Sequence, residues 1–267
     1  MTFDDQDRRD LEVAVELLES PSFVAKLSDV IGEPIEKVVS GLPVKTSKRV
    51  EDVVHSALVS LMNLAGRTLG DDRPKPASTI THKLAATVSG AIGGAFGLAA
   101  LSVELPITTS IILRSIADIA RSEGESLESI EARLACIEVF ALGGSAETDD
   151  ASETGYYAVR AGLSQLAPKA AEQLAKSGVS QKGADFVARF VAKISPRFSA
   201  LLGEKLAAQT APILGAVGGG TINYLFLDHF QNMARGHFIV RRLERKLGAE
   251  AVREEYELAA REMGFRK

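Results

Sequence analysis

Residues 213–248 read ILGAVGGGTINYLFLDHFQNMARGHFIVRRLERKLG, and this stretch decides the fold. It starts with glycine and small apolar residues, continues through large apolar ones, and ends in a basic segment. This pattern predicts one long helix over 213–247, ended by Gly248. Alternating β-branched residues joined by Asn-Gly turns, which would indicate strands, are missing from the sequence. We therefore expect an all-α protein.

The rest of the chain also follows a helical pattern. Further helices are predicted over 4–19, 22–31, 46–65, 79–103, 106–124, 126–142, 153–177, 181–193, 196–211 and 249–263. The clearest loops are 66–78, which contains Pro74 and Pro76, and the polar segment 145–152. We expect the first loop to separate an N-terminal helical subregion, 1–78, from a main helical domain, 79–267.

Two uncharged segments carry glycine on one helical face. In the first, between Lys83 and Glu104, the glycines are spaced i, i+3, i+4 and i+7; the second lies between Lys205 and Asp228. The glycines concerned are Gly90, Gly93, Gly94 and Gly97, then Gly215, Gly218 and Gly219. Each glycine costs a helix interior about 1 kcal/mol relative to alanine, and close approach of two backbones would offset that cost. We predict a multi-helix bundle with two tightly packed glycine-faced central helices; a membrane-inserting helical pair is the alternative.

Composition restricts the compartment and the partners. The formal net charge is −4, 46% of the residues are hydrophobic and 25% are charged, which is typical of a globular chain. Cys136 is the only cysteine, so an intrachain disulfide is excluded, and the acidic N-terminus lacks an apolar signal core. We expect a cytoplasmic protein, at most peripheral to the inner membrane. The mild acidity argues against nucleic acid as a partner.

No familiar catalytic motif is present, whether a zinc-binding His-Glu-x-x-His, a Gly-x-Ser-x-Gly elbow or a phosphate-binding loop. We expect neither a metal nor a cofactor. The candidates for a polar network are Glu104, Arg114, Asp118, Glu138, Asp228, His229 and His237. Glu104 precedes Pro106, where a helix break or kink is expected, and pairing with Arg114 is its favoured role. His229 and His237 are eight residues apart, about 80° around a helix, which is poor geometry for one metal ion.

A basic cluster follows the second glycine segment. It comprises Arg235, Arg241, Arg242, Arg245 and Lys246, with His237 among them. Cations at the end of a helix complement its dipole. They are also suited to contact with anionic lipid headgroups or with an acidic partner. Dipole complementation accounts for the last turn but not for Arg235, so both interpretations stay open.

Several motifs resemble the EcsC protein family. They are Ser102-Val103-Glu104-Leu105-Pro106, 113–120 (LRSIADIA), 137–144 (IEVFALGG), Gly155-Tyr156-Tyr157, Pro196-Arg197-Phe198, 215–226, 228–238 (DHFQNMARGHF) and 241–245 (RRLER). They occur in order over residues 80–250. The resemblance implies a bacterial protein whose relatives are encoded beside an ATP-binding-cassette transporter. It brings no established activity and no catalytic residues, although some relatives carry a peptidase label.

Three functions remain. The first is a non-enzymatic accessory protein at the cytoplasmic membrane face, partnered by an anionic membrane surface or a membrane protein complex in transport or envelope function. The second is a peptidase-like hydrolase with an unrecognised site around Glu104, Glu138 and His229. The third is a soluble homo-oligomeric scaffold whose glycine faces pack between subunits.

Overall fold

A computed structural model of the protein describes residues 3–20, 23–31, 101–143, 155–164, 166–169, 172, 181–210 and 215–266. Within these ranges every regular element longer than one turn is an α-helix and no strand occurs, which confirms the all-α fold. The labelled elements are α1 (Asp5–Glu19), α2 (Phe23–Ile31), α6 (Leu101–Ser122), α7 (Ile130–Glu138), the 3₁₀ turn η2 (Val139–Ala141), α8 (Tyr156–Ser164), α10 (Gln181–Thr210), α11 (Gly215–Leu247) and α12 (Ala249–Glu262).

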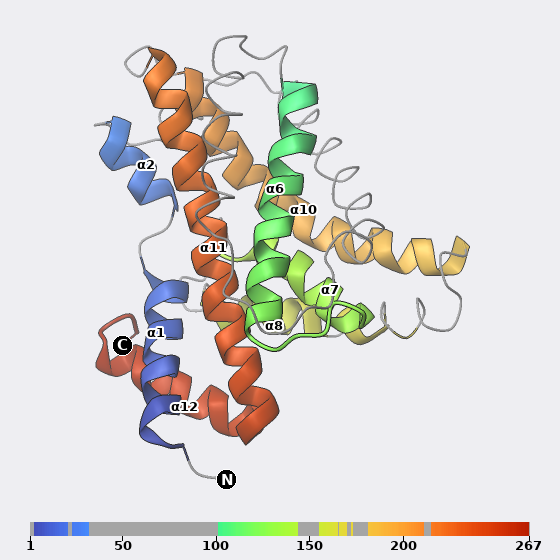
Figure 1. Ribbon diagram of the computed structural model, residues 1–267, viewed down its shortest axis with the longest axis vertical. Helices are drawn as coiled ribbons and strands as arrows, with labels where there is room; N and C mark the ends of the chain where they lie inside the picture. The colour runs from blue at the N-terminus through green and yellow to red at the C-terminus, as the bar shows by residue number, and fades with distance from the viewer. Residues whose placement is uncertain are drawn as a thin grey trace.

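The long helix α11 is the centre of the described structure (Figure 1). Helices α1, α2, α6, α10 and α12, together with η2, all pack against it. The predicted helix over 213–247 agrees with α11 to within two residues at its start. Because α11 contacts elements from both ends of the chain, its C-terminal half is the place where distant segments meet.

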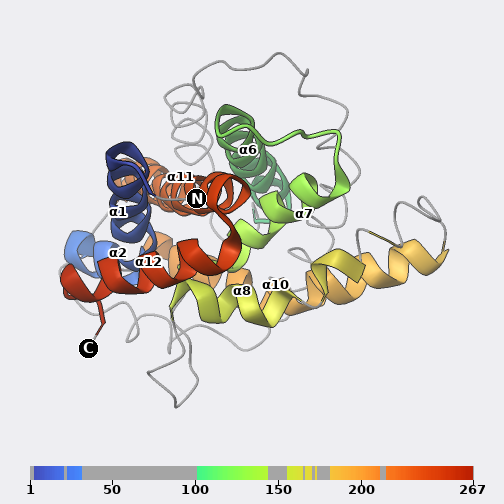
Figure 2. The ribbon, with the colours of Figure 1, turned by 90° about the horizontal axis from the view of Figure 1, so that it is seen from below.

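Helix α1 shows how local sequence sets both the start and the packing of a helix. Asp4 is its N-cap and accepts hydrogen bonds from the amides of Gln6 and Asp7, while Asp7 accepts one from the amide of Asp4. Its buried apolar residues are spaced i, i+3, i+4 and i+7: Leu11, Ala14, Val15 and Leu18. This stripe packs on α11 and α12, so the N- and C-terminal helices lie side by side (Figures 1 and 2).

Aromatic rings join four elements in the core. Phe23 of α2 lies edge-on to Phe226 of α11, with 5.2 Å between ring centroids. Phe140 of η2 is 4.8 Å from Phe198 of α10 and 5.3 Å from Phe230 of α11. All five side chains are fully buried, so the few aromatic residues of this sequence gather at the helix crossings.

Two helix boundaries predicted at prolines were wrong. Helix α6 runs without interruption from Leu101 to Ser122 through Pro106, so the expected break at Leu105 does not occur. Helix α10 likewise continues through Pro196, where two separate helices were predicted. A proline removes one backbone donor, and around Pro196 burial of the flanking Ile194 and Phe198 in the core holds the helix together.

Other predictions fall outside the described residues. These are the helices over 46–65 and 79–103, the loop over 66–78, and the first glycine face with Gly90, Gly93, Gly94 and Gly97. The backbone of Gly215, Gly218 and Gly219 is described and lies in the first turns of α11. Close packing of two glycine-faced helices therefore stays a prediction, and so does the division of the chain after residue 78.

Candidate functional site

The basic end of α11, residues 241–246, forms ion pairs with the segment that follows α6. Arg241 Nε lies 2.8 Å from Glu125 Oε1, and Arg245 pairs with the same carboxylate. Arg245 Nη2 also donates to the carbonyl oxygen of Glu123 at 2.8 Å, and Arg242 Nε lies 2.8 Å from Glu123 Oε2. The Glu125 side chain is only 7% exposed, so these pairs fix α11 against the end of α6.

A glycine turn places Glu125 for this contact. Helix α6 ends at Ser122, and Gly124 two residues later has a φ of +83°, a left-handed conformation that glycine adopts without strain. The Gly124 amide donates to the carbonyl oxygen of Arg121, and the Glu125 amide donates to that of Ala120, each at 3.0 Å. This is a Schellman end, which satisfies the last carbonyls of α6 and turns Glu125 toward α11.

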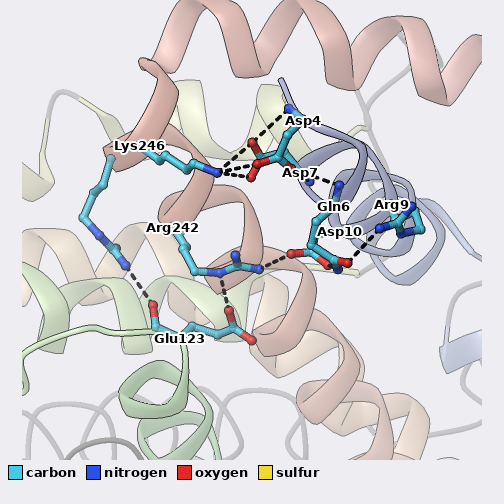
Figure 3. A network of polar contacts seen from close by, with 9 residues as sticks. Asp4, Gln6, Asp7, Arg9, Asp10, Glu123, Arg242 and Lys246 are labelled. Carbon is cyan, nitrogen blue, oxygen red and sulfur yellow. Dashed lines mark hydrogen bonds and ion pairs between the residues drawn. The ribbon is translucent and has the colours of Figure 1, made fainter. Parts of the chain in front are cut away.

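Helix α1 supplies the other acidic partners. Lys246 Nζ lies 2.7 Å from Asp7 Oδ1 and 3.2 Å from Asp4 Oδ2, and Arg242 Nη2 lies 2.8 Å from Asp10 Oδ2 (Figure 3). The carboxylates that cap α1 thus also bind the basic end of α11. Hydrogen bonds to Asp7 and Asp4 raise the pKa of Lys246, so its ammonium group stays charged.

A second acidic side chain of α1 fastens the C-terminus. Glu19 Oε1 accepts hydrogen bonds from Tyr256 Oη of α12 and from Arg266 Nη2, both at 2.9 Å. The amide of Tyr156, at the start of α8, lies 3.4 Å from the same oxygen. One carboxylate therefore links α1, α8, α12 and the C-terminal residues.

The structure brings together two of the predicted polar residues, Glu138 and His237. His237 of α11 is fully buried, and its Nε2 lies 3.8 Å from Glu138 Oε2 at the end of α7. Its Nδ1 lies 2.9 Å from Tyr156 Oη. Next to it, Glu244 binds Arg160 through both carboxylate oxygens, at 2.6 and 3.0 Å. Sequence reasoning missed the roles of Tyr156 and Arg160, because their α8 comes together with α7 and α11 only in the tertiary structure.

Burial sets the charge states of this cluster. Burial lowers the pKa of His237 well below its ordinary value, and the nearby Arg160 and Arg241 lower it further. Burial also raises the pKa of Tyr156, so the phenol keeps its proton. His237 is therefore neutral and shares a hydrogen bond with the Tyr156 hydroxyl through Nδ1, while its Nε2 faces Glu138 beyond hydrogen-bonding distance. A neutral imidazole sealed from solvent is suited to joining helices rather than to exchanging protons with a substrate.

His229 lies elsewhere on α11, in an aromatic setting. It is two helical turns from His237, about 12 Å along the axis. Its ring centroid is 5.1 Å from that of Phe230 and 5.7 Å from that of Phe23. Burial lowers the pKa of His229 to about 4, although a backbone hydrogen bond with Leu142 acts in the opposite direction. The predicted grouping of Glu138 with His229 is thus not the one found, since the histidine beside Glu138 is His237.

The remaining predicted residues lie apart from this cluster. Arg114 is exposed on α6, and the backbone of Glu104 belongs to the same helix, while its side chain lies outside the described residues. Asp118 forms an ion pair with Arg121 one turn along α6. Asp228 accepts a hydrogen bond from Asn232 Nδ2 at 3.1 Å. Among the basic residues, Arg235 is exposed on α11.

Within the described ranges, no three metal-binding side chains gather where an ion could be held. None of the helices in that part of the chain combines the length and the apolar character needed to cross a bilayer.

The fold and the site define an all-α protein whose central helix has a basic end bound by acidic residues from two other segments. The chain belongs to the EcsC protein family, whose family model matches residues 14–243. This confirms the resemblance found in the sequence. No curated protein and no solved structure matches the chain. The matched range begins within α1 and ends just before the last turn of α11, so most of α1's acidic pairing residues and all of α12 lie outside it.

Proposed function

We propose that this EcsC-family chain is a non-enzymatic accessory protein that associates with the anionic cytoplasmic face of a membrane. There it acts as an accessory to transport or envelope machinery. The observation that carries the proposal is the cationic face of α11. Arg235, Arg242 and Lys246 are spaced i, i+7 and i+11, which places them on one side of the helix.

The exposure of these groups supports contact with headgroups. Arg235 is exposed, and the side chains of Lys246 and Arg245 are 51% and 43% exposed even with their ion pairs formed. An anionic membrane surface attracts such side chains within about a Debye length, at roughly 1 kcal/mol for each cation.

The state of the buried cluster supports a role without catalysis. His237 is fully buried and Glu138 nearly so, and the hydrogen bonds and ion pairs around them run between helices of the same chain. A general acid or base must come within hydrogen-bonding reach of its substrate. These two side chains are instead placed to fix α7, α8 and α11 relative to one another.

Vesicle flotation tests the proposal. The full-length protein should float with phosphatidylcholine vesicles that contain phosphatidylglycerol, and remain at the bottom with phosphatidylcholine alone. The variant R235Q/K246Q should float less. The matched control K169Q/K193Q removes two exposed lysines from other segments and should float like the wild type.

Failure to float with anionic vesicles would refute the membrane function. Combined with a solution mass above that of one chain, that result would favour the oligomeric scaffold. Equal loss of flotation in both variants would show that net charge alone drives binding, and that the α11 face has no special part in it.

A further inference from the structure

The acidic start of α1 covers part of the cationic face to which the proposed function assigns membrane contact. We propose that residues 4–10 of α1 are an internal mask, which an anionic lipid surface displaces when the basic end of α11 binds it. This inference rests on the proposed function.

The ion pairs divide the basic end into a permanent part and a releasable part. Arg241 and Arg245 share Glu125, which is buried where α6 ends. Both carboxylates that pair with Lys246 in the described structure, in contrast, lie at the start of α1: its N-cap Asp4, and Asp7 in its first turn. Arg242 is intermediate, since it binds Asp10 of α1 and Glu123 beside α6. Displacing α1 therefore frees Lys246 completely and Arg242 in part.

The position of these acids along α1 permits local opening. Asp4, Asp7 and Asp10 all precede Leu11, the first apolar residue of the buried face, and of the three only Asp7 is itself buried. The first turns can therefore leave α11 while the stripe stays in the core. The ion pairs of Asp4 and Asp10 are partly exposed, so they contribute little to stability and another anion in water exchanges with them easily. The Asp7 carboxylate is only 4% exposed, and opening of the first turns returns it to water, which removes its cost of burial. A lipid surface offers many such anions at once.

Close packing after Leu11 explains why the rest of α1 stays in place. A Cβ atom added to Gly236 of α11 would lie 2.5 Å from Leu18 Cγ, so the two helices approach each other closely at this point. Glu19 adds its hydrogen bonds to Tyr256 and Arg266. The mask is thus tethered at its C-terminal end, while its N-terminal end is held by charge and by the partly buried Phe3, which packs against the core.

The test compares two variants of equal charge in full-length protein. The variant D4N/D7N/D10N neutralises the mask, and asparagine keeps the oxygen that caps the helix. The control D5N/E12Q/E16Q removes three exposed acids from the same helix, none of which pairs with the basic end of α11 in the described structure. Partitioning onto phosphatidylglycerol-containing vesicles should rise on the order of tenfold for the first variant, since up to two cations are released. It should rise much less for the control.

Equal gains in the two variants, or no gain in the mask variant while the wild type binds, would overturn the mask. If neither the wild type nor the variants bind anionic vesicles, the proposed function fails together with it. Amide hydrogen exchange on the wild type gives a second readout that needs no substitution. On binding vesicles, amides 8–14, which donate to the carbonyl oxygens of residues 4–10, should exchange faster while amides 15–18 stay protected. Unchanged protection of amides 8–14 in the bound protein would also overturn the mask.

Discussion

Replacing Gly143 by alanine should destabilise this protein through two separable effects. Gly143 follows η2 with a φ of +71°, a conformation that costs an L-residue roughly 1–2 kcal/mol. In addition, a Cβ atom there would lie 2.3 Å from His229 Cε1 and 2.8 Å from Met233 Sδ. The His229 ring lies between Phe23 and Phe230, so it has little room to move, and overpacking of this kind costs about 1–3 kcal/mol. The total loss is about 2–5 kcal/mol.

Gly124 provides the matched control. Its φ of +83° is similar, but the nearest atom to an added Cβ is Arg245 Nη2 at 3.7 Å, an ordinary van der Waals contact. Gly124→Ala should therefore cost only the backbone part, about 1–2 kcal/mol. The assay is urea unfolding of both variants, monitored by circular dichroism, with the free energy of unfolding extrapolated to water.

The difference between the two glycine variants isolates the contact with His229. Removing the ring in the double variant G143A/H229A should recover part of the loss, so the two substitutions together should cost less than the sum of their separate effects. A Gly143→Ala variant no less stable than Gly124→Ala, or strictly additive effects in the double variant, would refute the steric reasoning.

Three further predictions follow from buried groups. Glu244→Gln should lower the free energy of unfolding by about 2 kcal/mol, because it breaks the two-point contact with the partly buried Arg160. Glu257→Gln, which removes one partner of an exposed ion pair, should lower it by less than about 0.5 kcal/mol. Urea unfolding of both variants measures the difference. The pKa of His229 is about 4 in the folded state and 6.5 in the unfolded state, so the unfolded state takes up a proton first and the free energy of unfolding falls from pH 6.5 toward pH 4. His229→Phe should remove up to about 3 kcal/mol of that fall. An unchanged dependence of the free energy of unfolding on pH would contradict this prediction. The Cys136 thiol is buried, which raises its pKa, so it should react with a disulfide reagent only after unfolding; prompt labelling of the native protein would show that it is accessible.

The helices themselves could be predicted because their signals are local. The capping residues of α1, its stripe from Leu11 to Leu18, and Gly248 after α11 each act within a few residues of their helix. The errors came at Pro106 and Pro196, where a local rule favours a boundary but the helix continues through the proline. Propensity is a weak preference compared with burial of an apolar face.

The candidate site could be predicted only in its residue types. Polar and basic residues on α11 stand out in the sequence, and Glu138 and His237 were both among the candidates. Their partners did not stand out, since acidic residues near an N-terminus are usually no more than a solvated helix face. Nothing along the chain indicates that Asp7 lies beside Lys246, or that Tyr156 lies beside His237.

The sequence by itself determined that the chain is helical, that it belongs to the EcsC family and that α11 turns from apolar to basic along its length, since periodicity, motifs and composition are properties of the chain. Only the tertiary structure decided what the basic end touches. The acids of α1 precede the basic end by more than 230 residues in the sequence. In the structure, however, the side chains of Arg242 and Asp10, and those of Lys246 and Asp7, approach to less than 3 Å. Such pairs form because burial of the apolar stripe of α1 against α11 brings the two ends of the chain together, and the charges then meet at the edge of that contact.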